Sequence, residues 1–270
     1  MHKLVFHFTI LNMPSILLEI KNNIAIITLN RPEKFNSFNR EMALALQKIL
    51  AGCAADKKVS VLYITGSGKA FCAGQDLGEL TGPNPPGFDV ILSEHYNPIV
   101  TMIRNIEKPV LCAVNGVAAG AGANIALCCD TVVATASASF IQAFSKIGLI
   151  PDSGGTFTLP RLIGFQKASA LMMLGDKVNA TEAERIGMIY KVFADENFAE
   201  ESMKIAVALS KLPAKGLAYT KMALNASLNN SLPVQLKLED ELQFKAAHTF
   251  DYHEGINAFL EKRSPNFKGE

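Results

Sequence analysis

Residues 112–130 read CAVNGVAAGAGANIALCCD, and the rest of the chain is organised around this segment. An apolar run ends at Asn115-Gly116, and Gly120 and Gly122 precede a stretch rich in alanine, isoleucine and leucine. This order predicts a buried strand, a tight turn and a helix. The first turn of a helix presents unpaired backbone N–H groups, which bind an anion or an oxygen that becomes negative during a reaction. Alternatively, the two glycines only allow the helix and the strand to pack closely.

A second segment, residues 147–156 (IGLIPDSGGT), carries a single carboxylate. Asp152 can transfer a proton, or it can cap the helix expected after Gly154-Gly155, because aspartate is a favoured N-cap residue. Both interpretations remain open at this point. By contrast, Gly66-Ser67-Gly68-Lys69 fails as a phosphate-binding loop, because Tyr63 stands at the required upstream glycine and Ala70 follows the lysine.

The elements that must position these residues follow from hydrophobic periodicity. Residues 16–20 and 24–29 predict a hairpin, and Asn39 predicts the N-cap of an amphipathic helix. Further strands are expected at 59–65, 110–114 and 131–135, with a helix at 91–106, and this alternation predicts a parallel sheet covered by helices. Beyond residue 180 strands nearly vanish. A helix capped by Thr181 is expected to run to residue 186. Further helices are expected at 198–212, 215–228, 232–247 and 252–262.

Composition excludes several functional classes. The 270 residues carry a net charge of +1, which gives no electrostatic surface for nucleic acid. No apolar run approaches the roughly 18–20 residues that span a membrane. His248 and His253 are spaced poorly for a metal site, so no metal is expected. The five cysteines stand mostly in apolar surroundings, which predicts buried free thiols and a cytoplasmic protein.

Three motifs together resemble the crotonase superfamily, the enoyl-CoA hydratase/isomerase enzymes. They are residues 69–77 (KAFCAGQDL), 113–116 (AVNG) and 147–164, which contain IPDSGGT and LPRL. The resemblance implies an α/β crotonase (ClpP-like) fold, a spiral of ββα units with a helical C-terminal region. The implied division is an N-terminal extension (1–14), a core with the acyl-CoA site (15–195) and a helical trimerisation region (196–270). It also implies homotrimers or hexamers, and an acyl-CoA thioester substrate with no separate cofactor.

The resemblance also assigns site residues. Its oxyanion hole consists of two backbone N–H groups, which by motif position belong to Gln75 and Ala121. Such donors stabilise the enolate that forms when a proton is removed beside a thioester. Asp76 is expected to order its own loop. The other residues expected around the substrate are Ala73, Gly74, Asp76, Leu77, Gly120, Gly122, Asn124 and Phe144.

The same comparison separates hydration from isomerisation. Asn124 and Phe144 occupy the positions of the two glutamates that activate water in the hydratases, so simple hydration is disfavoured. Asp152 remains as a single acid/base, as in dienoyl-CoA isomerases and the ring-opening isomerases of phenylacetate breakdown. We expect Phe140, Phe144 and Ile150 to desolvate its carboxyl. Asn124 is expected to contact the acyl group or to hold Asp152, or else only to fill its position.

Within this resemblance we expect an acyl-CoA isomerase that shifts a double bond or opens an epoxidised ring. The alternatives are a Δ3,Δ2-enoyl-CoA isomerase of general fatty acid metabolism, a haloaryl-CoA dehalogenase and a non-catalytic acyl-CoA-binding subunit. The dehalogenases carry tryptophan where this chain has Phe144. A hydratase is a possible partner protein.

Overall fold

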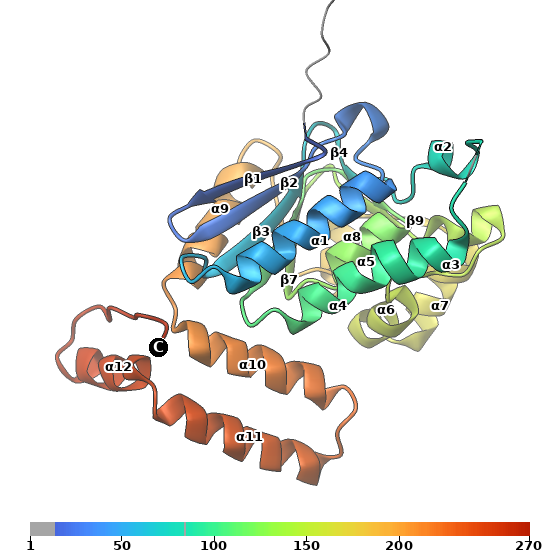
Figure 1. The fold of residues 1–270 in the computed structure, drawn as a ribbon. Coiled ribbons are helices and arrows are strands. Elements are labelled where there is room, and N and C mark those ends of the chain that lie inside the picture. The colour runs from blue at the N-terminus through green and yellow to red at the C-terminus, as the bar shows by residue number, and fades with distance from the viewer. Residues whose placement is uncertain (1–13, 84) are drawn as a thin grey trace, which may run out of the picture.

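The computed structural model describes residues 14–83 and 85–270, so the expected N-terminal extension lies outside the described residues except for Pro14. Two β-sheets form the centre (Figure 1). Six strands make the first sheet in the order β1-β2-β3-β5-β7-β10, and four make the second in the order β4-β6-β8-β9. The strands are Ile16–Lys21 (β1), Ile24–Leu29 (β2), Val61–Gly66 (β3), Ala70–Cys72 (β4), Val110–Val114 (β5), Val117–Ala119 (β6), Thr131–Thr135 (β7), Ser139–Ile141 (β8), Lys177–Asn179 (β9) and Lys191–Phe193 (β10).

The chain alternates between the two sheets as it advances. Strands β3, β5 and β7 enter the first sheet, and the strands that directly follow them, β4, β6 and β8, enter the second. In the described residues, strand pairs are parallel in both sheets except for β1 with β2 and β9 with β8. Strands β1 and β9 each lie at the edge of a sheet. Helices return the chain between successive strand pairs, which confirms the predicted spiral of ββα units. Because β4 and β6 are parallel, their carboxyl ends meet at the same edge.

Helices pack around the sheets and also form the C-terminal region. They are Arg40–Ala55 (α1), Leu77–Leu80 (α2), Phe88–Val90 (α3), Asn97–Asn105 (α4), Ala121–Leu127 (α5), Gly155–Ile163 (α6), Phe165–Leu174 (α7), Ala180–Arg185 (α8), Phe198–Ser210 (α9), Ala214–Ser227 (α10), Leu232–Ala247 (α11) and Phe250–Leu260 (α12). Short 3-10 helices span Pro32–Lys34 (η1) and Ala143–Ile147 (η3), and a π-helix spans Ile91–Tyr96 (η2). No helix of the described residues is both long and apolar enough to cross a membrane.

Most predicted elements are present. The β1–β2 hairpin turns at Asn22 and Asn23, which both adopt left-handed φ values. Asn39 caps α1 by accepting a hydrogen bond from the backbone N–H of Met42 at 3.0 Å. Two expectations are wrong in detail. Thr181 lies inside α8, because Asn179 takes the cap and accepts from the N–H of Glu182. The expected helix 91–106 is divided into the π-helix η2 and α4.

The core fills both faces of the six-stranded sheet. Side chains of α1, such as Met42 and Leu46, pack with Ile27 and Ile64 in the larger cluster, and α9 contributes Phe198 to a smaller cluster on the other face. Figure 1 shows α1 and α9 on opposite sides of β1–β3. All five cysteines are buried free thiols, as predicted.

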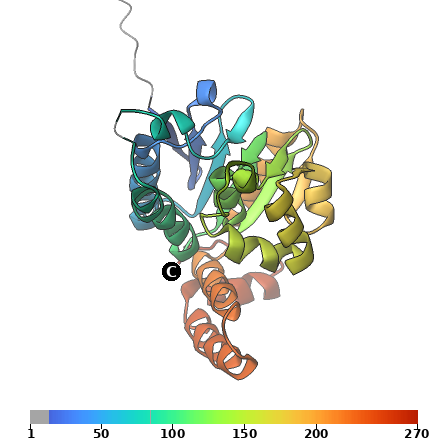
Figure 2. The ribbon, with the colours of Figure 1, turned by 90° about the vertical axis from the view of Figure 1, so that its right-hand side faces the viewer.

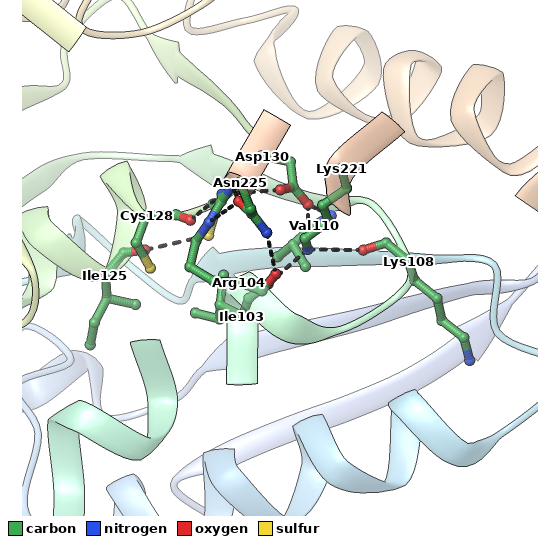
Figure 3. A network of polar contacts seen from close by, with 10 residues as sticks. Ile103, Arg104, Lys108, Val110, Ile125, Cys128, Asp130, Lys221 and Asn225 are labelled. Atoms are coloured by element: carbon green, nitrogen blue, oxygen red, sulfur yellow. Dashed lines mark hydrogen bonds and ion pairs between the residues drawn. The ribbon is translucent and has the colours of Figure 1, made fainter. Parts of the chain in front are cut away.

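Helices α10, α11 and α12 extend away from the sheets (Figures 1 and 2). A polar network joins α10 to the core (Figure 3). The ammonium of Lys221 lies 2.7 Å from Oδ2 of Asp130 and donates to the carbonyl of Ile103 at 2.7 Å. Arg104 pairs with the other oxygen of Asp130 at 3.1 Å, and its carbonyl accepts a hydrogen bond from Asn225 at 2.9 Å. The base of the helical region is therefore fixed by charge as well as by packing.

Candidate active site

The candidate site lies where strands β4 and β6 end side by side. The chain segments after these strands approach so closely that only glycine fits. A Cβ atom on Gly74 would lie 3.0 Å from the carbonyl oxygen of Ala119 and 3.6 Å from the backbone nitrogen of Ala121. A Cβ atom on Gly122 would lie 2.5 Å from the carbonyl oxygen of Cys72. The structure confirms the close packing that the glycines allow, and this packing brings residue 74 beside residue 121.

Two backbone N–H groups emerge at this junction. The N–H of Phe38 donates to Gly74 at 2.7 Å and its carbonyl accepts from Asp76 at 2.8 Å, so the N–H of Gln75 between them points away from Phe38. Ala121 is the first residue of α5, and Gly120 before it has φ 52°. The N–H of a first helical residue has no acceptor within its helix. Among the described residues, neither the Gln75 nor the Ala121 N–H donates to another protein group.

The side chain of Gln75 is held on both sides. Its Oε1 accepts a hydrogen bond from the hydroxyl of Tyr96 at 2.7 Å, and its Nε2 donates to Glu79 at 2.7 Å. The second oxygen of Glu79 accepts from the backbone N–H of Arg40 at 2.8 Å. Burial above all, with contributions from Cys72, Asp152 and Glu79, raises the pKa of Tyr96 well above its ordinary value. Tyr96 therefore acts as a neutral donor that fixes the loop after β4.

Asp152 lies in a tight turn and does not cap a helix. The carbonyl of Asp152 accepts a hydrogen bond from the N–H of Gly155 at 2.8 Å, and Ser153 and Gly154 between them have φ values of 51° and 74°. Left-handed φ at both central residues is the signature of a type I′ turn. Gly154 is the N-cap of α6, with no side-chain cap. The capping interpretation of Asp152 is therefore wrong, because its carboxylate points elsewhere.

The carboxyl of Asp152 is half-buried and its pKa is raised, chiefly because burial disfavours the charged form. A hydrogen bond from the Ser153 hydroxyl at 2.8 Å, together with the residue's own N–H, lowers the pKa and offsets part of this effect. Phe140 and Phe144 are buried, but Ile150 is 80% exposed, so the expectation that Ile150 desolvates Asp152 is wrong. The shift is in the direction that suits a general acid/base.

Asn124 connects the first turn of α5 to the Asp152 turn. Its Nδ2 donates to the carbonyl oxygen of Asp152 at 2.8 Å, and its Oδ1 accepts from the amide of Gln142 at 2.8 Å. The side chain is buried, and a Cβ on Gly155 would lie only 2.3 Å from its Nδ2. Of the expectations for Asn124, the structure shows the contact that holds Asp152, through the backbone.

The remaining predicted residues surround the same junction. Phe144 in η3 stands beside Gly120, where a Cβ atom would lie 3.7 Å from the phenyl ring. Ala73 and Leu77 are exposed. Asp76 orders its loop as expected, since it caps α2 at Gly78 and pairs with Arg31 at 2.8 Å. Burial alone would raise the pKa of Asp76, but the hydrogen bonds from Arg31 and Gly78 outweigh it and lower the pKa.

Four contributors were not found by sequence reasoning: Tyr96, Glu79, Ser153 and Gln142. Tyr96 stands between polar residues in SEHYNP, where nothing marks it as a hydrogen-bond donor to the site. The π-helix η2 that carries it has no periodicity that distinguishes it from an α-helix. Ser153 lies in the segment where the sequence predicts a helix start, so its type suggests no contact with Asp152. In the described part of the chain, no group of three or more His, Cys, Asp or Glu side chains is arranged to hold a metal ion.

A spiral of ββα units with a helical C-terminal region is the crotonase fold. The chain belongs to the enoyl-CoA hydratase/isomerase family, whose model matches residues 19–270. It is 45% identical over 262 residues to 1,2-epoxyphenylacetyl-CoA isomerase of Escherichia coli (strain K12), covering 96% of this chain and 100% of that protein. It is 44% identical over 253 residues to a Rhodobacter capsulatus protein named "Probable enoyl-CoA hydratase", covering 93% of this chain and 96% of that protein.

Solved structures agree with this assignment. The crystal structure of enoyl-CoA hydratase from Bacillus anthracis superposes with a TM-score of 0.89 at 32% identity, covering 95% of this chain and 100% of that one. Relatives named as isomerases and as hydratases thus share this fold, and overall similarity does not separate the two activities.

Proposed function

We propose that this protein is an acyl-CoA isomerase that works through a thioester enolate, with Asp152 as its single acid/base. The observation that carries the proposal is the placement of the half-buried Asp152 carboxyl in the turn that Asn124 ties to α5, where burial raises its pKa. The two positions at which hydratases of this family carry glutamates hold an amide and a phenyl ring. The amide of Asn124 is already bonded to Asp152 and Gln142, so it does not activate water.

The reaction proceeds in two proton transfers. The carboxylate of Asp152 removes a proton from C2 of a 3-enoyl thioester, and the electron pair moves onto the carbonyl oxygen. The N–H groups of Gln75 and Ala121 donate to that oxygen and stabilise the enolate more than the starting carbonyl. The protonated Asp152 then returns its proton to C4, the double bond shifts to C2–C3, and the carboxylate is regenerated.

The preferred substrate class is an epoxidised phenylacetyl thioester. The relative named 1,2-epoxyphenylacetyl-CoA isomerase supports this choice, since it is similar over nearly the whole chain. In such a substrate, loss of the C2 proton opens the epoxide and the ring expands. The protonated Asp152 then returns its proton to a ring carbon, so the product is an isomer of the substrate. Coenzyme A enters as part of the substrate, and the reaction requires no further cofactor.

We further propose a cytoplasmic homotrimer or hexamer. Large apolar side chains on the helical C-terminal region are exposed in the single chain, which supports association through this region. These side chains include Leu232, Val234, Leu236, Phe244, Phe259 and Leu260.

The decisive experiment is the conversion of a 3-enoyl-CoA to its 2-enoyl isomer in heavy water. The wild type should turn over the substrate and incorporate deuterium, whereas Asp152→Asn should lose about 10²–10⁴-fold in kcat. Glu196→Gln is the matched control, because it neutralises an exposed carboxylate between β10 and α9. Equal activity of wild type and Asp152→Asn would contradict the proposal. Epoxyphenylacetyl-CoA is the next substrate.

Three further assays test the alternatives. Release of chloride from a chloroaryl-CoA would identify a dehalogenase. Binding of acyl-CoA without exchange of the C2 proton would identify a binding subunit, which needs no acid/base. Hydration of crotonyl-CoA by the wild type at a rate above isomerisation would identify a hydratase, the activity in the name of the Rhodobacter capsulatus relative.

A further inference from the structure

The backbone of Asp152 is fixed from two directions. Its carbonyl oxygen accepts from the N–H of Gly155 across the turn and from the amide of Asn124 on α5, both at 2.8 Å. Only the side-chain torsions of Asp152 therefore remain to place its carboxylate. Any group that bonds one carboxylate oxygen then decides where the other oxygen points.

Ser153 is an unexpected residue at the second position of this turn. Its φ of 51° is left-handed, a conformation that glycine adopts freely and that costs energy in a residue with a Cβ atom. Its neighbour Gly154 meets the same requirement with glycine. The serine is only 2% exposed, and its hydroxyl donates to Oδ1 of Asp152 at 2.8 Å. Within residues 14–83 and 85–270 it has no other acceptor. The hydroxyl is therefore committed to Asp152.

We propose that Ser153 is a positioning residue that binds Oδ1 of Asp152 and leaves Oδ2 as the oxygen that exchanges the proton. The proposal rests on the function proposed above, in which Asp152 is the acid/base. It explains why a serine stands at this left-handed position, because a glycine would form the same turn but would have no hydroxyl to orient the carboxylate.

The hydroxyl also sets the protonation of Asp152, because a hydrogen bond to the charged form favours that form. Tyr96 is the titratable group that the charge of Asp152 influences, and two further groups act on Tyr96. Tyr96 lies on η2, and the groups that act on it are Glu79 on α2 and Cys72 on β4. Burial raises the pKa of Cys72 to about 12, and Tyr96 donates to Gln75, so both are neutral at pH 7. Glu79 has both oxygens engaged, by Gln75 and by Arg40.

The test measures the pKa of Asp152 directly and through catalysis. Protein labelled with [γ-13C]aspartate is titrated by NMR, and the Asp152 signal is assigned by its loss in Asp152→Asn. Ser153→Ala removes the hydroxyl and keeps the strained φ, whereas Ser153→Gly removes the hydroxyl and relieves it. In both variants the Asp152 pKa should rise by about one unit, and the acid limb of the kcat–pH profile should move with it.

Ser139→Ala is the matched control, because Ser139 on β8 is also buried and its hydroxyl has no partner in the described residues. It should leave both measurements unchanged. An Asp152 pKa that stays at the wild-type value in both Ser153 variants would overturn the proposal, and so would a shift in Ser153→Ala alone, which would indicate backbone strain. Full activity of Asp152→Asn would instead refute the proposed function, while the NMR titration would still decide whether Ser153 holds the carboxylate.

Discussion

The half-buried carboxyl of Asp152 lowers the stability of the folded protein when it is ionised. Its pKa in the folded protein is raised, chiefly by burial, so the fold favours the protonated form. Between the unfolded and the folded pKa the native state binds more protons, and stability falls as pH rises through that window. Below the pKa of aspartate in the unfolded chain, about 3.9, Asp152 is protonated in both states, so it no longer makes stability depend on pH.

Asp152→Asn should therefore raise Tm at neutral pH, although it removes activity. The gain should shrink as pH falls towards about 4, because the wild-type carboxyl is then protonated in both states. Calorimetry of the two proteins across this range measures the difference. A variant that melts below the wild type at pH 7 would show that the native state favours the charged carboxylate.

The two N–H donors can be tested one atom at a time. Replacing Ala121 by lactic acid, through suppression of a stop codon, exchanges its N–H for an ester oxygen and keeps the methyl side chain. Loss of one such donor should lower kcat about a hundredfold or more. The same exchange at Ala214, the first residue of α10, is the matched control and should leave kcat unchanged. Equal rates for both esters would exclude the Ala121 N–H from catalysis.

At the residue scale, the sequence points to candidate site residues only where they belong to motifs. Gln75, Ala121 and Asp152 fall within glycine-containing segments with characteristic spacing. The structure places Gln75 in a β-bridge with Phe38, Ala121 at the start of α5 and Asp152 in a tight turn. Sequence reasoning did not identify Ser153 or Tyr96, because their roles depend on a left-handed φ and on a π-helix, respectively. Neither feature leaves a signature in residue type alone.

At the scale of elements, glycine spacing holds β4 and α5 together. A Cβ on Gly122 would meet the carbonyl oxygen and the sulfur of Cys72 at 2.5 and 2.6 Å, so one of the two segments must move. Gly52 in α1 is the matched control, because a Cβ there meets nothing within 4 Å.

Gly122→Ala should destabilise the protein by about 1–3 kcal/mol, as overpacking does, and should lower kcat because residues 75 and 121 separate. Gly52→Ala should stabilise it by about 0.5–1 kcal/mol, because alanine loses less backbone entropy in a helix. Urea unfolding and steady-state kinetics on both variants check this. A neutral Gly122→Ala would show that the contact between β4 and α5 is loose.

The strands and long helices were predictable because their hydrophobic periods are strong. The hairpin at 16–29, the buried strand at 110–114 and the capped helix from residue 40 all appear where the pattern puts them. Errors arise where two signals compete. Asn179 and Thr181 are both good caps, and Asn179 takes the role because α8 begins directly after β9, at Ala180.

At the scale of the whole molecule, the Lys221 network joins the helical region to the spiral core. Lys221 is only 8% exposed, and burial lowers its pKa although the Asp130 carboxylate opposes the shift. Removing one member of a buried pair leaves the other without its counter-charge, which costs roughly 3–5 kcal/mol. Asp130 keeps Arg104, so the loss should lie at or below the lower end of that range.

Lys221→Met keeps the length of the side chain and removes the charge, so it should lower the free energy of unfolding. Lys204→Met is the matched control. Lys204 pairs with Glu200 and Glu201 on the exposed face of α9, and its loss should change stability little. Chemical denaturation followed by circular dichroism compares the two. Equal small effects would show that packing alone attaches α10 to the core.

The N–H groups of Gln75 and Ala121 have an evolutionary consequence. A codon change alters the side chain at either position, but every amino acid other than proline supplies the same donor. The donor itself therefore does not depend on the identity of the side chain, whereas the glycines that force the backbone into place cannot be replaced without moving it. A lineage built on this fold can therefore exchange one acyl substrate for another by ordinary point mutation, because the donor pair is inherited as a shape of the chain.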